Sequence, residues 1–81
     1  MRVVSWNVNG IRAIEKKGEL DKLIKTEKPD LLFIQEIKAK VEQLSDALVN
    51  PPGYDVHYHS AEKPGYSGTG VFIKKKLFPK V

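Results

Sequence analysis

The sequence contains no cysteine among its 81 residues, which excludes disulfide cross-links and thiolate metal sites. It also lacks a long apolar run, because the longest one is Leu31–Ile34 and a membrane-spanning helix needs about 20 apolar residues. The N-terminus has no apolar stretch of the kind found in secretory signals. We therefore expect a cytoplasmic protein that does not contact a membrane.

The composition is that of an ordinary soluble domain. Hydrophobic residues make up 41% of the chain and charged residues 30%, which excludes disordered and collagen-like classes. A chain of this length forms one small domain at most.

The net charge of +4 is unevenly distributed. Four lysines lie within Lys74–Val81, and residues 1–73 are neutral by themselves. A basic total can indicate nucleic-acid binding, but lysines gathered at one end are more typical of a solvated turn, which we favour here.

Residue spacing predicts an alternation of strands and short helices. From Arg2 to Val8 the pattern is that of a strand, which Asn9-Gly10 ends. Apolar residues at helical spacing follow, with a break at Gly18 and a second helix from Glu19 to about Lys28. The later expected elements are a strand over Asp30–Gln35, a short helix through Val41, Leu44 and Leu48, a strand over Tyr54–His59, a polar loop over Ser60–Thr69 and a strand over Gly70–Lys74.

The order β-α-β-α-β-β indicates an α/β protein with one sheet of about four strands. The apolar run Leu31–Ile34 predicts a strand covered on both faces. Three short helices can cover one face of such a sheet, and no segment of this sequence remains for the other. We therefore expect residues 1–81 to be part of a larger α/β sandwich.

Two polar residues stand at the ends of expected strands, where α/β proteins usually bind ligands. Glu36 directly follows a buried strand, and a carboxylate there is costly to desolvate unless it is paired or binds a cation. It would equally suit the N-terminus of a following helix. Asn7 by itself is more simply explained as a turn residue before Asn9-Gly10.

The segment Gly65–Gly70 is rich in glycine, which lets a backbone approach a ligand such as a phosphate chain. Tyr66 adds a ring for stacking and a hydroxyl for hydrogen bonding. A hairpin-like loop is the alternative. His57 and His59 share one strand face, and without a matching carboxylate we favour partly exposed strand histidines over a metal site.

Three motifs occur together in the order found in one known family. The segment Ser5–Ala13 resembles the opening strand of the exonuclease III family of abasic-site endonucleases. Gln35–Lys38 is similar to its Gln-Glu-Thr-Lys motif, and Gly65–Val71 to its Gly-Tyr-Ser-Gly-x-Gly segment. Lys28-Pro29-Asp30 precedes the second strand as in the family, so the resemblance covers essentially the whole chain. Residues 1–81 then correspond to the N-terminal third of one family domain.

The resemblance implies a four-layer α/β sandwich of the deoxyribonuclease-I type. In this chain we expect one mixed sheet of about four strands with flanking helices. The implied protein is a DNA-repair hydrolase that uses Mg²⁺, or Mn²⁺, to cleave the phosphodiester 5′ to an abasic site. It also removes nucleotides from 3′ ends. The expected partners are double-stranded DNA with abasic sites or 3′ ends, and the remainder of the domain.

The resemblance also assigns roles to particular residues. Glu36 and Asn7 form the catalytic pair and the metal site, with Glu36 as the Mg²⁺-binding carboxylate. The residues expected to contact DNA are Asn9, Arg12, Ala13, Lys38, Tyr66, Ser67 and Gly68.

Two departures from the family pattern matter. Ile37 stands where the family usually has Thr, which removes a hydroxyl beside Glu36. The family's phosphate-contacting Tyr, water-positioning Asp-x-Asn and Asp-His pair have no counterparts here, so we expect the 81 residues alone to be inactive. The alternatives are another metal-dependent phosphoesterase of the same superfamily and a non-catalytic basic nucleic-acid-binding fragment that uses Lys74–Lys76.

Overall fold

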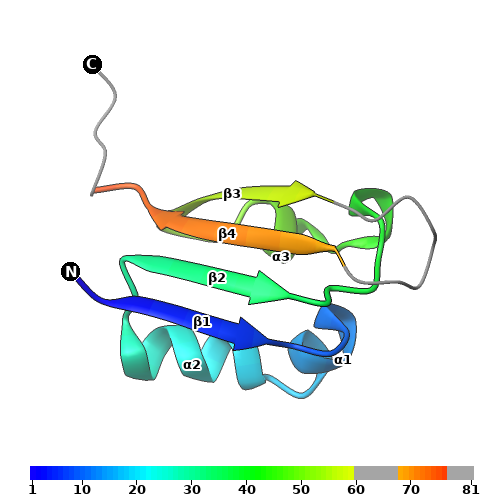
Figure 1. Ribbon diagram of the computed structural model, residues 1–81, viewed down its shortest axis with the longest axis horizontal. Coiled ribbons are helices and arrows are strands. Elements are labelled where there is room, and N and C mark those ends of the chain that lie inside the picture. The colour runs from blue at the N-terminus through cyan, green and yellow to red at the C-terminus, as the bar shows by residue number, and fades with distance from the viewer. Residues whose placement is uncertain (60–67, 77–81) are drawn as a thin grey trace.

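The computed structural model describes residues 1–59 and 68–76, in which strands and short helices alternate (Figure 1). In chain order the elements are β1 (Val3–Asn7), α1 (Ile11–Lys16), α2 (Glu19–Glu27), β2 (Leu31–Gln35), the 3₁₀ turn η1 (Val41–Gln43), α3 (Asp46–Val49), β3 (Tyr54–His59) and β4 (Thr69–Lys74). No helix within the described ranges is both long and apolar enough to cross a membrane.

The four strands form a mixed sheet in the order β1-β2-β4-β3. β1 and β2 run parallel, and α1 and α2 form the crossover between them, as a parallel pair requires. β4 runs antiparallel to both of its neighbours. The sheet confirms the expected fold class for the part of the chain that the structure describes.

The core lies between the sheet and the helices. Alternate residues of the two central strands point toward the helices, and Leu32, Ile34 and Phe72 are completely buried there. Leu20 of α2 and Leu48 of α3 close this core from the helical side. Burial of these side chains is the main stabilising term, because apolar surface removed from water contributes roughly 25 cal/mol per Å².

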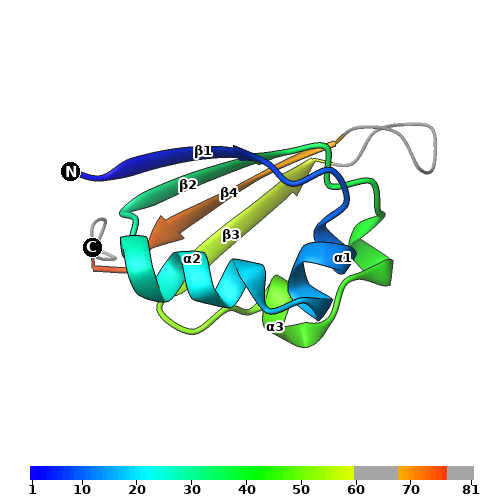
Figure 2. The same ribbon diagram turned by 90° about the horizontal axis from the view of Figure 1, so that it is seen from below.

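The opposite face of the sheet carries no helix, because α1, α2 and α3 all lie on one side (Figure 2). Val3 and Phe33 point from this open face and are 54% and 41% exposed. Within the described residues only one face of β2 is covered, and cover for the other face from the rest of a larger sandwich stays a prediction. The expectation of one uncovered sheet face is confirmed.

Turn residues set the helix boundaries. Gly18 adopts a left-handed conformation with φ 74° and separates α1 from α2, as predicted. The single short helix expected between Val41 and Leu48 is instead two elements, η1 and α3. Leu44 and Ser45 adopt extended backbone between them, and Ser is a favoured residue before the first turn of a helix.

Candidate active site at the ends of β1 and β2

The parallel pairing of β1 and β2 brings Asn7 and Glu36 to one edge of the sheet. In this register Asn7 lies opposite Gln35, so Glu36 is the next residue beyond the pair. The two loops that follow the strands then remain in contact. The amide nitrogens of Val8, Gly10 and Ile11 donate to the carbonyl oxygens of Gln35, Glu36 and Ile37 over 3.0, 2.8 and 3.0 Å.

Four polar side chains form a closed ring at this edge. The Asn7 amide nitrogen donates to Oε2 of Glu36, and its Oδ1 accepts the backbone N–H of Asn9 at 3.0 Å. Lys38 Nζ donates to Oδ1 of Asn9 and lies 4.0 Å from Oε1 of Glu36. The ring holds Glu36 by one oxygen and leaves Oε1 without a hydrogen bond from the described residues.

Three members of the ring have a left-handed backbone, which is uncommon for residues other than glycine. The φ angles are 46° at Asn9, 55° at Glu36 and 52° at Lys38. Each such residue costs about 1–2 kcal/mol, and conformations of this kind cluster at functional sites. The hydrogen bonds of the two loops therefore hold the backbone in a conformation that brings the four side chains of the ring together.

Within the ring, Glu36 is suited to act as one carboxylate ligand of a magnesium ion. The Glu36 side chain is 41% exposed, and carboxylate oxygens are the ligands that Mg²⁺ prefers. The Asn7 amide oxygen is occupied by Asn9, so the geometry favours Asn7 as the residue that orients Glu36; its role as a ligand stays a prediction. The described ranges contain no group of three or more His, Cys, Asp or Glu residues that could hold a metal ion.

A basic hollow of about 380 Å³ lies beside the ring. It is lined by Gly10, Arg12, Ala13, Lys16 and Lys38. Three of these were predicted as DNA contacts, whereas Lys16 was missed. Its spacing of four residues from Arg12 on α1 places both on one helix face and could have revealed it. Neither Arg12 nor Lys16 forms an ion pair with another described residue.

The structure also tests the non-functional interpretations of the two strand-end residues. Glu36 does not begin a helix, since the next helical element starts at Val41. Asn7 accepts the turn hydrogen bond from Asn9 and also donates to Glu36, so the turn interpretation is confirmed and the catalytic role of Asn7 stays a prediction.

The remaining predicted positions lie elsewhere. Gly68 is buried, and its carbonyl accepts the backbone N–H of Ile37 at 3.3 Å. It therefore packs beneath the site, and its contact with DNA stays a prediction. Tyr66 and Ser67 fall outside the described residues. His57 and His59 are exposed on β3, as strand histidines.

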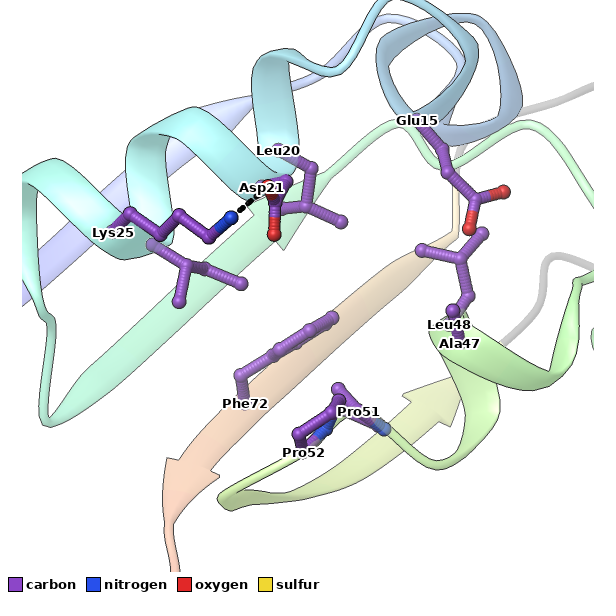
Figure 3. Close-up of a pocket in the computed structure, with 10 residues that line it drawn as sticks. Glu15, Leu20, Asp21, Lys25, Ala47, Leu48, Pro51, Pro52 and Phe72 are labelled. Carbon is purple, nitrogen blue, oxygen red and sulfur yellow. Dashed lines mark ion pairs between the residues drawn. The ribbon is translucent and has the colours of Figure 1, made fainter.

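A second hollow lies on the helical side of the sheet and is largely apolar (Figure 3). It measures about 320 Å³, and Leu20, Leu48 and Phe72 are among its walls. The charged groups at its rim are already engaged: Lys25 pairs with Asp21 at 2.9 Å, and Glu15 accepts a hydrogen bond from Ser45. This hollow offers no acid–base or metal chemistry and includes neither Asn7 nor Glu36.

Comparison with known proteins gives consistent matches. Residues 4–81 match the profile described as Endonuclease/Exonuclease/phosphatase family. The chain is 40% identical to an exodeoxyribonuclease of Bacillus subtilis over 76 residues, which are 94% of this chain and 29% of that protein. It is 37% identical to a DNA-(apurinic or apyrimidinic site) endonuclease of Dictyostelium discoideum over 94% of this chain and 20% of that protein.

Among solved structures, the AP endonuclease LMAP from Leishmania major superposes with a TM-score of 0.75 at 38% identity. The superposition covers 94% of this chain and 24% of that one. The chain thus spans between about a fifth and three tenths of the length of these relatives.

Proposed function

Because the chain belongs to the endonuclease/exonuclease/phosphatase family, we propose that it contributes the Glu36 half of the active site of a DNA-repair nuclease. The reaction is hydrolysis of the phosphodiester 5′ to an abasic site, together with removal of nucleotides from 3′ ends. The observation that carries the proposal is the Asn7–Glu36 pair at the ends of two parallel strands. The names of the relatives support DNA as the substrate.

The chemistry assigned to the ring follows from its hydrogen bonds. When bound, Mg²⁺, or Mn²⁺ in its place, would supply positive charge to offset the charge on the scissile phosphate and on the leaving oxygen. Glu36 would hold the ion through Oε1, the oxygen without a hydrogen bond. Asn7 fixes the other oxygen and adds no charge, as neighbours of metal ligands commonly do. Lys38 lies close enough to contact a substrate phosphate next to the carboxylate.

The basic hollow supports binding to the DNA backbone. Arg12, Lys16 and Lys38 contribute three positive charges to its lining, Ala13 lines it as well, and Asn9 accepts a hydrogen bond from Lys38. Cationic side chains of this kind hold phosphates and fix the register of the protein without reading sequence. Tyr66, Ser67 and Gly68 are proposed to approach the duplex from the loop before β4.

A different phosphoesterase of the same superfamily is the second candidate, because a carboxylate held by an amide would serve any phosphate ester. The hollow beside Glu36 favours a polyanionic backbone over a small substrate. A non-catalytic basic fragment that binds through Lys74–Lys76 is less well supported, since Lys74 lies 3.9 Å from Asp30 and is partly neutralised. Cleavage that EDTA abolishes separates the enzyme from the binder.

The decisive experiment uses a chimera in which this chain replaces the matching segment of the Bacillus subtilis relative. Glu36→Gln is expected to keep the fold and to lower Mg²⁺-dependent incision of an abasic duplex by about 100-fold or more, since the metal contributes several kcal/mol. Glu42→Gln in η1 is the matched control and should cleave normally. Near-normal incision by Glu36→Gln at low Mg²⁺ would refute the assignment.

A further inference from the structure

Ile37 is completely buried although its neighbours on both sides are partly exposed at the candidate site. Its exposed fraction is 0%, whereas the Glu36 and Lys38 side chains are about two-fifths exposed. Both neighbours have left-handed backbone, with φ 55° and 52°. The chain therefore turns Ile37 into the core and presents the two charged side chains to the ring.

Gly68 lies directly against the Ile37 side chain. A β-carbon at position 68 would lie 2.9 Å from Cγ1 of Ile37 and 3.3 Å from the carbonyl oxygen of His59, closer than such atoms normally approach. Gly68 also has φ 94°, which other residues rarely adopt. The Ile37 side chain therefore packs against Gly68 only because position 68 has no β-carbon.

Backbone hydrogen bonds join three segments at the same residue. The Ile37 nitrogen donates to Gly68, and the Ile37 carbonyl accepts from Ile11. Ile37 thus ties the loop after β2 both to the entry of β4 and to the start of α1. No other backbone interaction of the described residues links the loop after β2 to Gly68.

We propose that Ile37 is a positioning residue that holds Glu36 in its left-handed conformation by packing beneath Gly68. The inference rests on the proposed function of Glu36. The side chain acts from the core through shape and has no need of a hydrogen bond to the carboxylate. Loss of this packing would let the loop relax and turn the carboxylate away from Asn7.

The test measures kcat, KM and the half-saturating Mg²⁺ concentration of the chimera described above. Ile37→Ala is expected to lower kcat by about 10- to 100-fold and to raise the half-saturating Mg²⁺ concentration, with KM for the abasic duplex within about twofold, as for residues that orient metal ligands. Ile37→Val keeps the branch beneath Gly68 and is expected to shift both quantities by about two- to threefold. Gly68→Ala, which would collide with Cγ1, should lower kcat and raise the half-saturating Mg²⁺ concentration as Ile37→Ala does.

The control is Leu48→Ala, which removes an equally buried side chain from the helical side of the core. It should lower the unfolding temperature and leave kcat and Mg²⁺ dependence unchanged in the folded enzyme. A folded Ile37→Ala enzyme that behaves like Leu48→Ala would overturn the inference. If Ile37→Ala does not fold, Ile37→Val provides the test. An Ile37→Val enzyme with the kcat and the Mg²⁺ dependence of the unmutated chimera would overturn the inference.

Glu36→Gln is measured in parallel, so that the two proposals can fail separately. An inactive Glu36→Gln enzyme beside an unaffected Ile37→Ala enzyme removes only the positioning role. An active Glu36→Gln enzyme removes the proposed function, and the positioning role with it.

Discussion

The side-chain amide of Asn7 donates a hydrogen bond to the Glu36 carboxylate across a separation of 29 residues. The parallel register of β1 and β2 makes this contact possible, because it places Asn7 opposite Gln35. The contact engages one of the two carboxylate oxygens and leaves the other without a hydrogen bond from the described residues. The first prediction tests this arrangement.

Asn7→Ala is expected to lower Mg²⁺-dependent incision by about 10- to 100-fold, because the carboxylate loses the partner that orients it. Asn7→Asp should be at least as damaging, since it removes the donor and places a second negative charge against Glu36. The matched control is Asn50→Ala, which removes an exposed amide that donates to Asp46 away from the site. Equal activities for Asn7→Ala and Asn50→Ala would show that the contact has no role.

Arg12→Ala and Lys16→Ala are each expected to weaken DNA binding with little dependence on sequence. Each should reduce the slope of log affinity against log salt by about one unit, because one phosphate contact is lost. Titrations at several salt concentrations measure the slope. Lys25→Ala on α2 removes a charge outside the basic hollow and should leave the slope unchanged. An unaltered slope for Lys16→Ala would place that side chain away from phosphate.

The free energy of unfolding is expected to fall as the pH rises above about 10. The reason is that two tyrosines keep their protons to higher pH in the folded chain than in the unfolded chain. Burial, with a smaller effect of Glu15, raises the pKa of Tyr58, and burial with Asp30 raises the pKa of Tyr54 above 10.0. Unfolded tyrosines ionise near pH 10, so the stabilisation is complete below that pH and is lost above it.

Urea unfolding between about pH 8 and 11 measures this loss. The Tyr58 hydroxyl donates to the carbonyl of Leu48 at 2.8 Å, so Tyr58→Phe also removes a hydrogen bond and lowers stability at every pH. The informative quantity is therefore the pH dependence, which should be weaker in Tyr58→Phe than in the parent. A parallel decline in the two proteins would contradict the prediction.

The open face of the sheet is expected to make the isolated 81-residue chain associate. Exposed apolar side chains on an uncovered sheet face favour contact between copies. Phe33→Lys should shift sedimentation toward the monomer without unfolding the chain, because Phe33 points away from the helical core. Val41→Lys, at an exposed apolar position in η1, is the control and should leave association unchanged. A monomeric parent chain would contradict the prediction.

The sequence by itself determined the elements and the positions of the candidate residues. Alternation and apolar runs predicted the strands, and Gly18 was correctly expected to separate two helices. These signals are local, because periodicity and backbone preferences depend on neighbours in the chain. The position of Glu36 immediately after a strand was readable for the same reason.

The tertiary structure decided which distant residues meet. The register of β1 and β2 joined Asn7 to Glu36, and the loop contacts brought Lys38 to Asn9. The side on which the helices packed decided that Leu32 and Ile34 are buried and that Phe33 is exposed. Such outcomes depend on strand pairing and on shape complementarity across the fold, as between Ile37 and Gly68, and no local pattern in the sequence specifies them.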